Sequence, residues 1–215
     1  MTALTLDSLD LAALLCSKVC HDVINPVGAI SIGLEMLDDN PDEETRTAAL
    51  ELVAKSAKSA SAKLEYHRLA FGAAGSAGAA IDTGTAEAVA RGLFADDKTS
   101  LVWLAERVLM PKNKVKLLLN LCLIAASAIP RGGEIQVAIT GPAETPVFGV
   151  RSKGIYCRLA QTIPALVAGE PETGSVDAHG IQAFYTGLVA RACAMAVKIQ
   201  AQDGAIVIDA TPQAA

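Results

Sequence analysis

A pair of seven-residue repeats within residues 9–71 constrains the fold more than any other feature of the sequence. Such a repeat places its members along one side of a helix, where they can pack against another helix. In the first repeat the members, at alternating steps of four and three residues, are Cys16, Cys20, Val23, Val27, Ile30, Leu34 and Leu37. In the second they are Leu50, Val53, Ala57, Ala60, Leu64, His67 and Phe71. The sequence therefore predicts two long helices.

Turn-forming and acidic residues, Asp38-Asp39-Asn40-Pro41-Asp42, separate the two repeats. Asn and Pro favour a turn, and acids favour the start of the next helix because a helix N-terminus carries partial positive charge. The two helices therefore form a hairpin. Because a lone hairpin leaves one side of its repeats open to water, we expect two copies of the chain to pair as a homodimer with a four-helix bundle.

A second structural unit follows Gly72–Ala80, a run of small residues with the composition of a linker. The pattern then alternates between helical segments, near 85–94, 112–128, 155–167 and 181–200, and extended segments, near 101–104, 134–140, 146–151 and 205–209. This alternation predicts a two-layer α/β sandwich. The expected fold class is α+β, with the helical hairpin in residues 1–75 and the sandwich in residues 76–215.

Composition and charge exclude several classes of protein. The longest uncharged apolar stretch, Leu117–Ile129, is shorter than the ~20 residues that span a bilayer, so we expect no membrane association. The first ten residues carry acids where an export signal carries bases, which favours a cytoplasmic location. A net charge of −5 argues against direct binding of nucleic acid. The five cysteines form no CxxC pair and are interpreted as reduced core thiols.

His21 is the candidate reactive residue, because it lies on the predicted first helix away from the repeat. A neutral imidazole can act as a nucleophile and form a phosphoramidate. The neighbouring Asp22 and Asn25 can orient the ring or relay its proton. Pro26 removes the backbone N–H that would have bonded to the carbonyl of Asp22, which predicts a bend close to the imidazole. A lone exposed histidine is more often without function, so the assignment depends on the surrounding pattern.

That pattern resembles two motifs of sensor histidine kinases. The run His21–Ile30, H-D-V-I-N-P-V-G-A-I, is similar to the H-box, in which the reactive histidine is followed by an acid and, a few residues on, by Asn-Pro or Thr-Pro. Residues 111–135, which contain Asn120, are similar to the N-box helix and the next strand of the kinase ATP-binding domain. The two segments occur in the family's order.

The departures from the kinase pattern concern the nucleotide site. Ile124 stands where the N-box has a second asparagine for Mg²⁺, and isoleucine cannot bind a hard cation. Residues 147–154 have no acid to grip adenine. Bulky side chains fill His179–Leu188, where the family has glycines that approach phosphates. We therefore expect neither ATP binding nor autophosphorylation, and no bound cofactor or metal.

A kinase-like chain with an intact histidine and no nucleotide site resembles the dimeric histidine phosphotransferases of alphaproteobacteria. The resemblance implies a degenerate kinase ATPase-like second domain and a cytoplasmic shuttle in cell-cycle regulation. His21 would accept a phosphoryl group from the receiver domain of a CckA-like hybrid kinase and pass it to CtrA-like and CpdR-like response regulators. The receiver would supply Mg²⁺.

Partner contacts are expected on the strip around His21, where side chains are small or apolar. The charged residues of the former nucleotide region could instead steer an acidic receiver. The candidate docking residues are Ser17, Lys18, Ile24, Gly28, Ile32, Arg151 and Arg158.

Two other functions stay open at this point. One is an ATP-dependent histidine kinase with a divergent nucleotide pocket. The other is a binding protein that sequesters a response regulator without phosphorylation.

Overall fold

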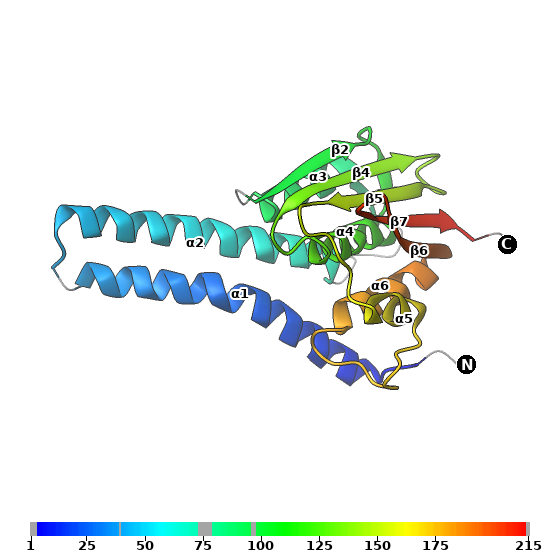
Figure 1. Cartoon of the computed structure of the whole chain (residues 1–215), viewed down its shortest axis with the longest axis horizontal. Coiled ribbons are helices and arrows are strands. Elements are labelled where there is room, and N and C mark those ends of the chain that lie inside the picture. Colours follow the sequence, from blue (N-terminus) through cyan, green and yellow to red (C-terminus); the bar gives the residue numbers. More distant parts are fainter. Residues whose placement is uncertain (1–3, 39, 73–78, 96–97, 214–215) are drawn as a thin grey trace.

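Two long antiparallel helices extend from a smaller part built of helices and a sheet (Figure 1). The computed structural model describes residues 4–38, 40–72, 79–95 and 98–213. Helices α1 (Ser8–Asp38) and α2 (Glu43–Ala70) form the hairpin, which confirms the predicted helical pair and the α+β fold class. No helix in these ranges is both long enough and apolar enough to cross a membrane.

The turn of the hairpin uses residues suited to it. Asn40 adopts a positive φ of 54°, a conformation that asparagine tolerates better than most residues. Asp42 then caps α2, because its Oδ1 accepts a hydrogen bond of 2.8 Å from the backbone N–H of Thr45. The same bond lowers the pKa of Asp42, since it favours the ionised carboxylate.

Only half of each seven-residue repeat is covered within the hairpin. The partly or fully buried members are Val23, Ile30 and Leu37 of the first repeat and Val53, Ala60, His67 and Phe71 of the second. The exposed members are Cys16, Cys20, Val27 and Leu34 of the first repeat and Leu50, Ala57 and Leu64 of the second. The interpretation of Cys16 and Cys20 as core thiols is therefore wrong for the single chain, where both are exposed. Two helices can cover only one side of each other.

The second part of the chain is a five-stranded sheet with helices on one face. The strands, in spatial order, are β2 (Thr99–Leu104), β4 (Gly133–Thr140), β5 (Val147–Lys153), β7 (Ala205–Pro212) and β6 (Met195–Gln202). β2 and β4 are parallel and the other pairs are antiparallel. A separate small sheet pairs β1 (Ala80–Asp82) with β3 (Leu109–Pro111).

Four helices complete this part: α3 (Thr83–Leu93), α4 (Lys112–Ser127), α5 (Thr162–Ala168) and α6 (Ile181–Ala192). α4 packs on β4, β5 and β7, and the core lies between this helix and the sheet. One row across the sheet, Val137, Val150 and Ile208, is fully buried. The predicted two-layer α/β sandwich is confirmed.

Several predicted boundaries differ from the structure. The helix predicted for 155–167 begins only at Thr162. The helix predicted for 181–200 ends at Ala192, and the strand β6 follows it, because Ala194 adopts a positive φ of 52° that breaks the helix. The short strands β1 and β3 were not predicted. Most of the predicted linker, residues 73–78, lies outside the described residues, as does the expected domain boundary near residue 75.

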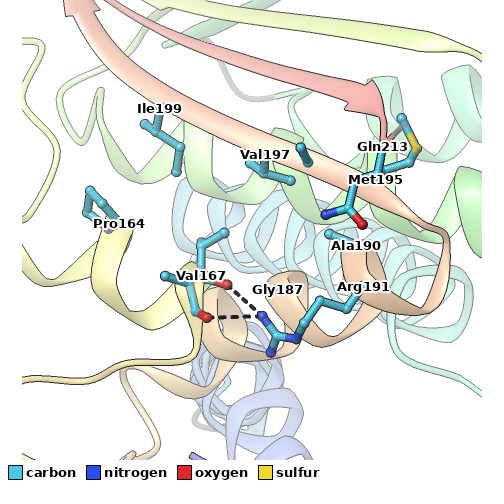
Figure 2. A pocket seen from close by; sticks show the side chains of 11 residues that line it. Pro164, Val167, Gly187, Ala190, Arg191, Met195, Val197, Ile199 and Gln213 are labelled. Atoms are coloured by element: carbon cyan, nitrogen blue, oxygen red, sulfur yellow. Dashed lines mark hydrogen bonds between the residues drawn. The ribbon is translucent and has the colours of Figure 1, made fainter. Parts of the chain in front are cut away.

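Helices α5 and α6 approach each other closely at Gly187. A Cβ atom added there would lie 1.9 Å from the carbonyl oxygen of Val167. Arg191, one turn later on α6, donates hydrogen bonds to the carbonyls of Val167 and Ala168 at 3.1 and 3.3 Å, beside a cavity of about 330 Å³ (Figure 2). These bonds satisfy carbonyls at the end of α5 that have no partner within their own helix.

We expect Gly187→Ala to lower the free energy of unfolding by about 1–3 kcal/mol, because the added methyl group forces two backbones apart. Gly28→Ala is the matched control. It also replaces a glycine inside a helix, but its Cβ would meet nothing within 4 Å, so stability should not fall. Urea unfolding followed by circular dichroism measures both. Equal stability of the two variants would contradict the close approach of α5 and α6.

Candidate functional site

His21 lies in the middle of α1 with 70% of its side chain exposed. Its Nδ1 is 3.5 Å from Oδ1 of Asp22, the next residue. A proton on Nδ1 is favoured by this carboxylate, which leaves the lone pair of the neutral ring on Nε2. An exposed imidazole in this tautomer can act as a nucleophile.

The carboxylate of Asp22 is held by two basic side chains. Lys18, one turn earlier on α1, pairs with Oδ2, and Nε2 of His67 on α2 lies 3.1 Å from the same oxygen. Burial raises the pKa of Asp22, but the contacts with His67 and Lys18 outweigh burial and hold the pKa well below its usual range. Asp22 is therefore a carboxylate at neutral pH, with Oδ1 left to face His21.

Pro26 creates the need for another contact at this level. It has no N–H, so the carbonyl oxygen of Asp22 has no partner within α1. Lys63 of α2 reaches across the hairpin and donates a hydrogen bond of 2.8 Å to this oxygen. α1 continues through the buried Pro26 as one helix to Asp38. The bond thus gives the Asp22 carbonyl the partner that Pro26 cannot provide, and it places an ammonium group near the site.

His67 connects the site to the second part of the chain. Its side chain is only 4% exposed, and its ring stacks on Phe71 with centroids 5.2 Å apart. Phe71 in turn packs edge-on against Tyr185 of α6, at 5.7 Å. The contacts run from Asp22 through α2 into the helical layer that covers the sheet.

A second imidazole approaches His21 from the segment before α6. The ring centroid of His179 lies 6.3 Å from that of His21, in an edge-on arrangement. Asp177 shapes this turn, since its Oδ1 accepts hydrogen bonds from the backbone N–H groups of His179 and Gly180 at 3.1 and 2.7 Å. His179 also lines a cavity of about 440 Å³ beside α5. Two segments far apart in the sequence therefore meet at His21.

The predicted docking residues fall into two groups. Ser17, Ile24, Gly28 and Ile32 are all exposed on α1, and Ile24 and Ile32 keep 65% and 56% of their surface open. Asn25 is exposed beside them. Lys18 is instead engaged with Asp22. Arg151 and Arg158 are exposed on β5 and in the segment after it, rather than on the α1 strip.

Sequence reasoning gave no role to three residues that the structure places at the site: Lys63, His67 and His179. For Lys63 a signal was available, because a proline inside a helix frees a carbonyl that some donor must satisfy. His67 was recognised as part of the second repeat, but its partner was not. His179 carries no local pattern that could have placed it near His21.

The two N-box positions of the region that resembles a nucleotide site are packed against protein. Asn120 is fully buried, and its amide donates hydrogen bonds of 2.9 Å to the carbonyls of Ala70 and Lys116. Gln182 of α6 donates to the side-chain and backbone oxygens of Asn120 at 3.2 and 3.0 Å. Ile124 is also fully buried. The asparagine that resembles the first one of the N-box thus packs α2, α4 and α6 together.

No group of three or more His, Cys, Asp or Glu side chains is placed to hold a metal ion, within the residues that the structure describes.

Comparisons with known proteins show which family this chain resembles. The family model for the histidine phosphotransferase C-terminal domain matches residues 83–205. Protein phosphotransferase ChpT of Brucella abortus (strain 2308) is 47% identical over 206 residues, which are 96% of this chain and 97% of that protein. A bacterial phosphotransferase solved at 1.7 Å is 44% identical, with a TM-score of 0.88 over 98% of this chain and 100% of that chain. The histidine kinase AdeS of Acinetobacter baumannii shows a weaker likeness, 14% identical with a TM-score of 0.46 over 90% of this chain and 97% of that chain.

We expect Lys63→Met to lower the free energy of unfolding by about 1–3 kcal/mol, because it leaves the carbonyl of Asp22 without a partner. In a Pro26→Ala background the helix regains the missing N–H, so the same Lys63→Met change should cost clearly less. Urea unfolding of the wild type, both single variants and the double variant measures this coupling. Strictly additive effects would mean that Lys63 does not serve the carbonyl freed by Pro26.

Proposed function

This chain belongs to the histidine phosphotransferase family, and we propose that His21 is the residue on which it carries the phosphoryl group. Its function is that of a histidine phosphotransferase. The observation that carries the assignment of His21 is its exposed imidazole, whose Nδ1 faces a carboxylate held by Lys18 and His67. We further propose residues 1–75 as the phosphotransfer and dimerisation part and residues 76–215 as the degenerate kinase-like part.

The transfer proceeds in two steps that mirror each other. Nε2 of His21 attacks the phosphorus of a receiver aspartyl phosphate, the N–P bond forms, and the P–O bond breaks with its electron pair left on the receiver carboxylate. Positive charge develops on the ring, and the carboxylate of Asp22 stabilises it or accepts the Nδ1 proton. In the second step a carboxylate of another receiver attacks the phosphorus, and the electron pair of the N–P bond returns to Nε2. Asn25 lies one turn from His21 and can orient the ring.

The proposed partners are receiver domains of a CckA-like hybrid kinase and of CtrA-like and CpdR-like response regulators. Ser17, Ile24, Gly28 and Ile32 provide a small and apolar strip along the helix that carries His21. Arg151 and Arg158 add positive charge that can steer an acidic receiver. The receiver supplies Mg²⁺, which neutralises charge on the moving phosphoryl group. We place this exchange in the cytoplasm and in cell-cycle regulation.

We also propose that the chain does not phosphorylate itself from ATP. Burial of Asn120, and its hydrogen bonds to Ala70, Lys116 and Gln182, support this proposal, because a nucleotide would have to displace them. Each displaced bond would leave a buried polar group without its partner, at a cost of about 1–3 kcal/mol.

Dimerisation through the hairpin is supported by the exposed half of the repeats. Each of Val27, Leu34, Leu50 and Leu64 leaves about half of its surface open, and all four are members of the repeats on the two long helices. Pairing of two hairpins would cover these side chains in a four-helix bundle.

A phosphorylated receiver domain should label the wild-type protein with an acid-labile phosphoryl group, and His21→Ala should carry no label. Incubation with labelled ATP alone should label neither protein. Gel detection after transfer measures both results, and circular dichroism checks that the variant is folded. Since His21 is exposed, the substitution should not disturb the helix. A label retained on His21→Ala would place the phosphoacceptor elsewhere, whereas receiver binding without any label would favour sequestration.

Leu50→Glu and Leu64→Glu should convert the dimer to a monomer, because two charges would be buried in the bundle core. Leu104→Glu is the matched control, since Leu104 is about as exposed, at 52%, but lies on β2. Light scattering after size exclusion gives the mass of each variant. A wild type that elutes as a monomer at micromolar concentration would contradict the proposal.

A further inference from the structure

His67 is a buried ionisable side chain that the phosphotransfer steps above do not use. It is only 4% exposed, on the side of α2 that faces α1. Such burial of a polar ring is costly unless a partner compensates for it. The partner is Asp22, whose Oδ2 lies 3.1 Å from Nε2. Within the part of the chain that the structure describes, Nδ1 has no partner, and Nε2 lies within ion-pair distance of Oδ2 without the alignment of a good hydrogen bond.

This arrangement selects one tautomer of His67. The single proton of a neutral ring is favoured on Nε2, where it meets a carboxylate, since a proton on Nδ1 would be buried without an acceptor. The ring has little freedom to turn away, because it stacks on Phe71 with an angle of 21° between the planes. His67 can therefore hold Asp22 in one orientation.

The orientation of Asp22 determines what His21 meets. Lys18 and His67 both contact Oδ2, whereas Oδ1 faces Nδ1 of His21 at 3.5 Å. If His67 is removed, Lys18 alone holds the carboxylate, and Lys18 is a flexible side chain on the same helix as Asp22. The carboxylate can then rotate, and the preference of His21 for a proton on Nδ1 is lost.

We propose that His67 is a positioning residue for phosphoryl transfer: through Asp22 it keeps the proton of His21 on Nδ1 and the lone pair on Nε2. The inference rests on the proposed role of His21. It assigns to α2 a part in the chemistry of a histidine on α1. The stacking of His67 on Phe71, and the edge-on contact of Phe71 with Tyr185, also make this positioning dependent on how α6 packs against the hairpin.

The test compares two substitutions of His67. His67→Phe keeps a planar ring that can stack on Phe71 but has no N–H, whereas His67→Gln keeps an N–H donor at the distance of Nε2. We expect His67→Phe to slow transfer from a phosphorylated receiver by about tenfold to a hundredfold, the effect of removing a group that orients a metal-binding histidine. Transfer by His67→Gln should stay within about threefold of the wild type. The affinity for the receiver should not change in either variant.

A second readout reports the tautomer directly. Nitrogen-15 spectra of the His21 ring, in unphosphorylated protein, should show the proton mainly on Nδ1 in the wild type and in His67→Gln. In His67→Phe the fraction with the proton on Nε2 should increase. In an Asp22→Asn background, His67→Phe should have no further effect on the transfer rate, because the group it positions is gone.

Tyr66→Phe is the control for general destabilisation. Tyr66 is the buried neighbour of His67 on α2, and its hydroxyl donates a hydrogen bond of 2.6 Å to the carbonyl of Leu119 rather than to the site. Its loss should lower stability without changing the tautomer of His21 or the transfer rate.

Two results would overturn the inference: wild-type transfer by a folded His67→Phe protein, or equal losses in His67→Phe and His67→Gln with an unchanged His21 tautomer. Failure of the proposed function is a different result, because it appears as a label retained on His21→Ala whatever residue stands at 67.

Discussion

A missing N–H in the middle of α1 is the constraint on which the site depends. Pro26 cannot donate to the carbonyl of Asp22, and the protein resolves this with a hydrogen bond from Lys63 on the facing helix. Because that bond crosses the hairpin, it fixes which residues of the two helices lie side by side. His67, one turn after Lys63, is thereby placed against the carboxylate of Asp22. A local defect in one helix thus sets the long-range geometry around His21.

The second part of the chain fastens the hairpin with residues that resemble a nucleotide site. The amide of Asn120 and the ammonium of Lys116 donate hydrogen bonds to the carbonyls of Ala70 and Gly72, at the end of α2. A helix end leaves such carbonyls without partners, so these two side chains of α4 act as a cap. Lys116 is only 7% exposed, and this burial lowers the pKa of its ammonium group. The helix that resembles the N-box thus holds the end of the hairpin.

The sequence was sufficient for features set by local spacing. The repeats predicted both long helices, and the run His21–Ile30 predicted an imidazole that the structure shows to be exposed on α1. The sequence did not show which members of each repeat face the other helix of the hairpin, because a seven-residue period defines a side of a helix and not the helix that packs against it. The proximity of His179 to His21 follows from the packing of α6, which no local pattern encodes. Likewise the strand β6 was not predicted, because residues 181–200 as a whole also suit a helix. The helix ends at Ala192, and the positive φ of Ala194 separates it from the strand.

Both ends of the hairpin are attached at the same side of the molecule. Leu4, just before α1, donates a backbone hydrogen bond of 2.8 Å to the carbonyl of Gly169. The end of α2 packs against α4. The turn between α1 and α2 lies at the opposite end of the hairpin (Figure 1). The hairpin is therefore attached at one end only, and thermal bending displaces its turn far more than its attached end. His21 lies about 20 Å along α1 from the clamp. An approaching receiver therefore meets a target that moves little, and less entropy is lost when the two proteins align.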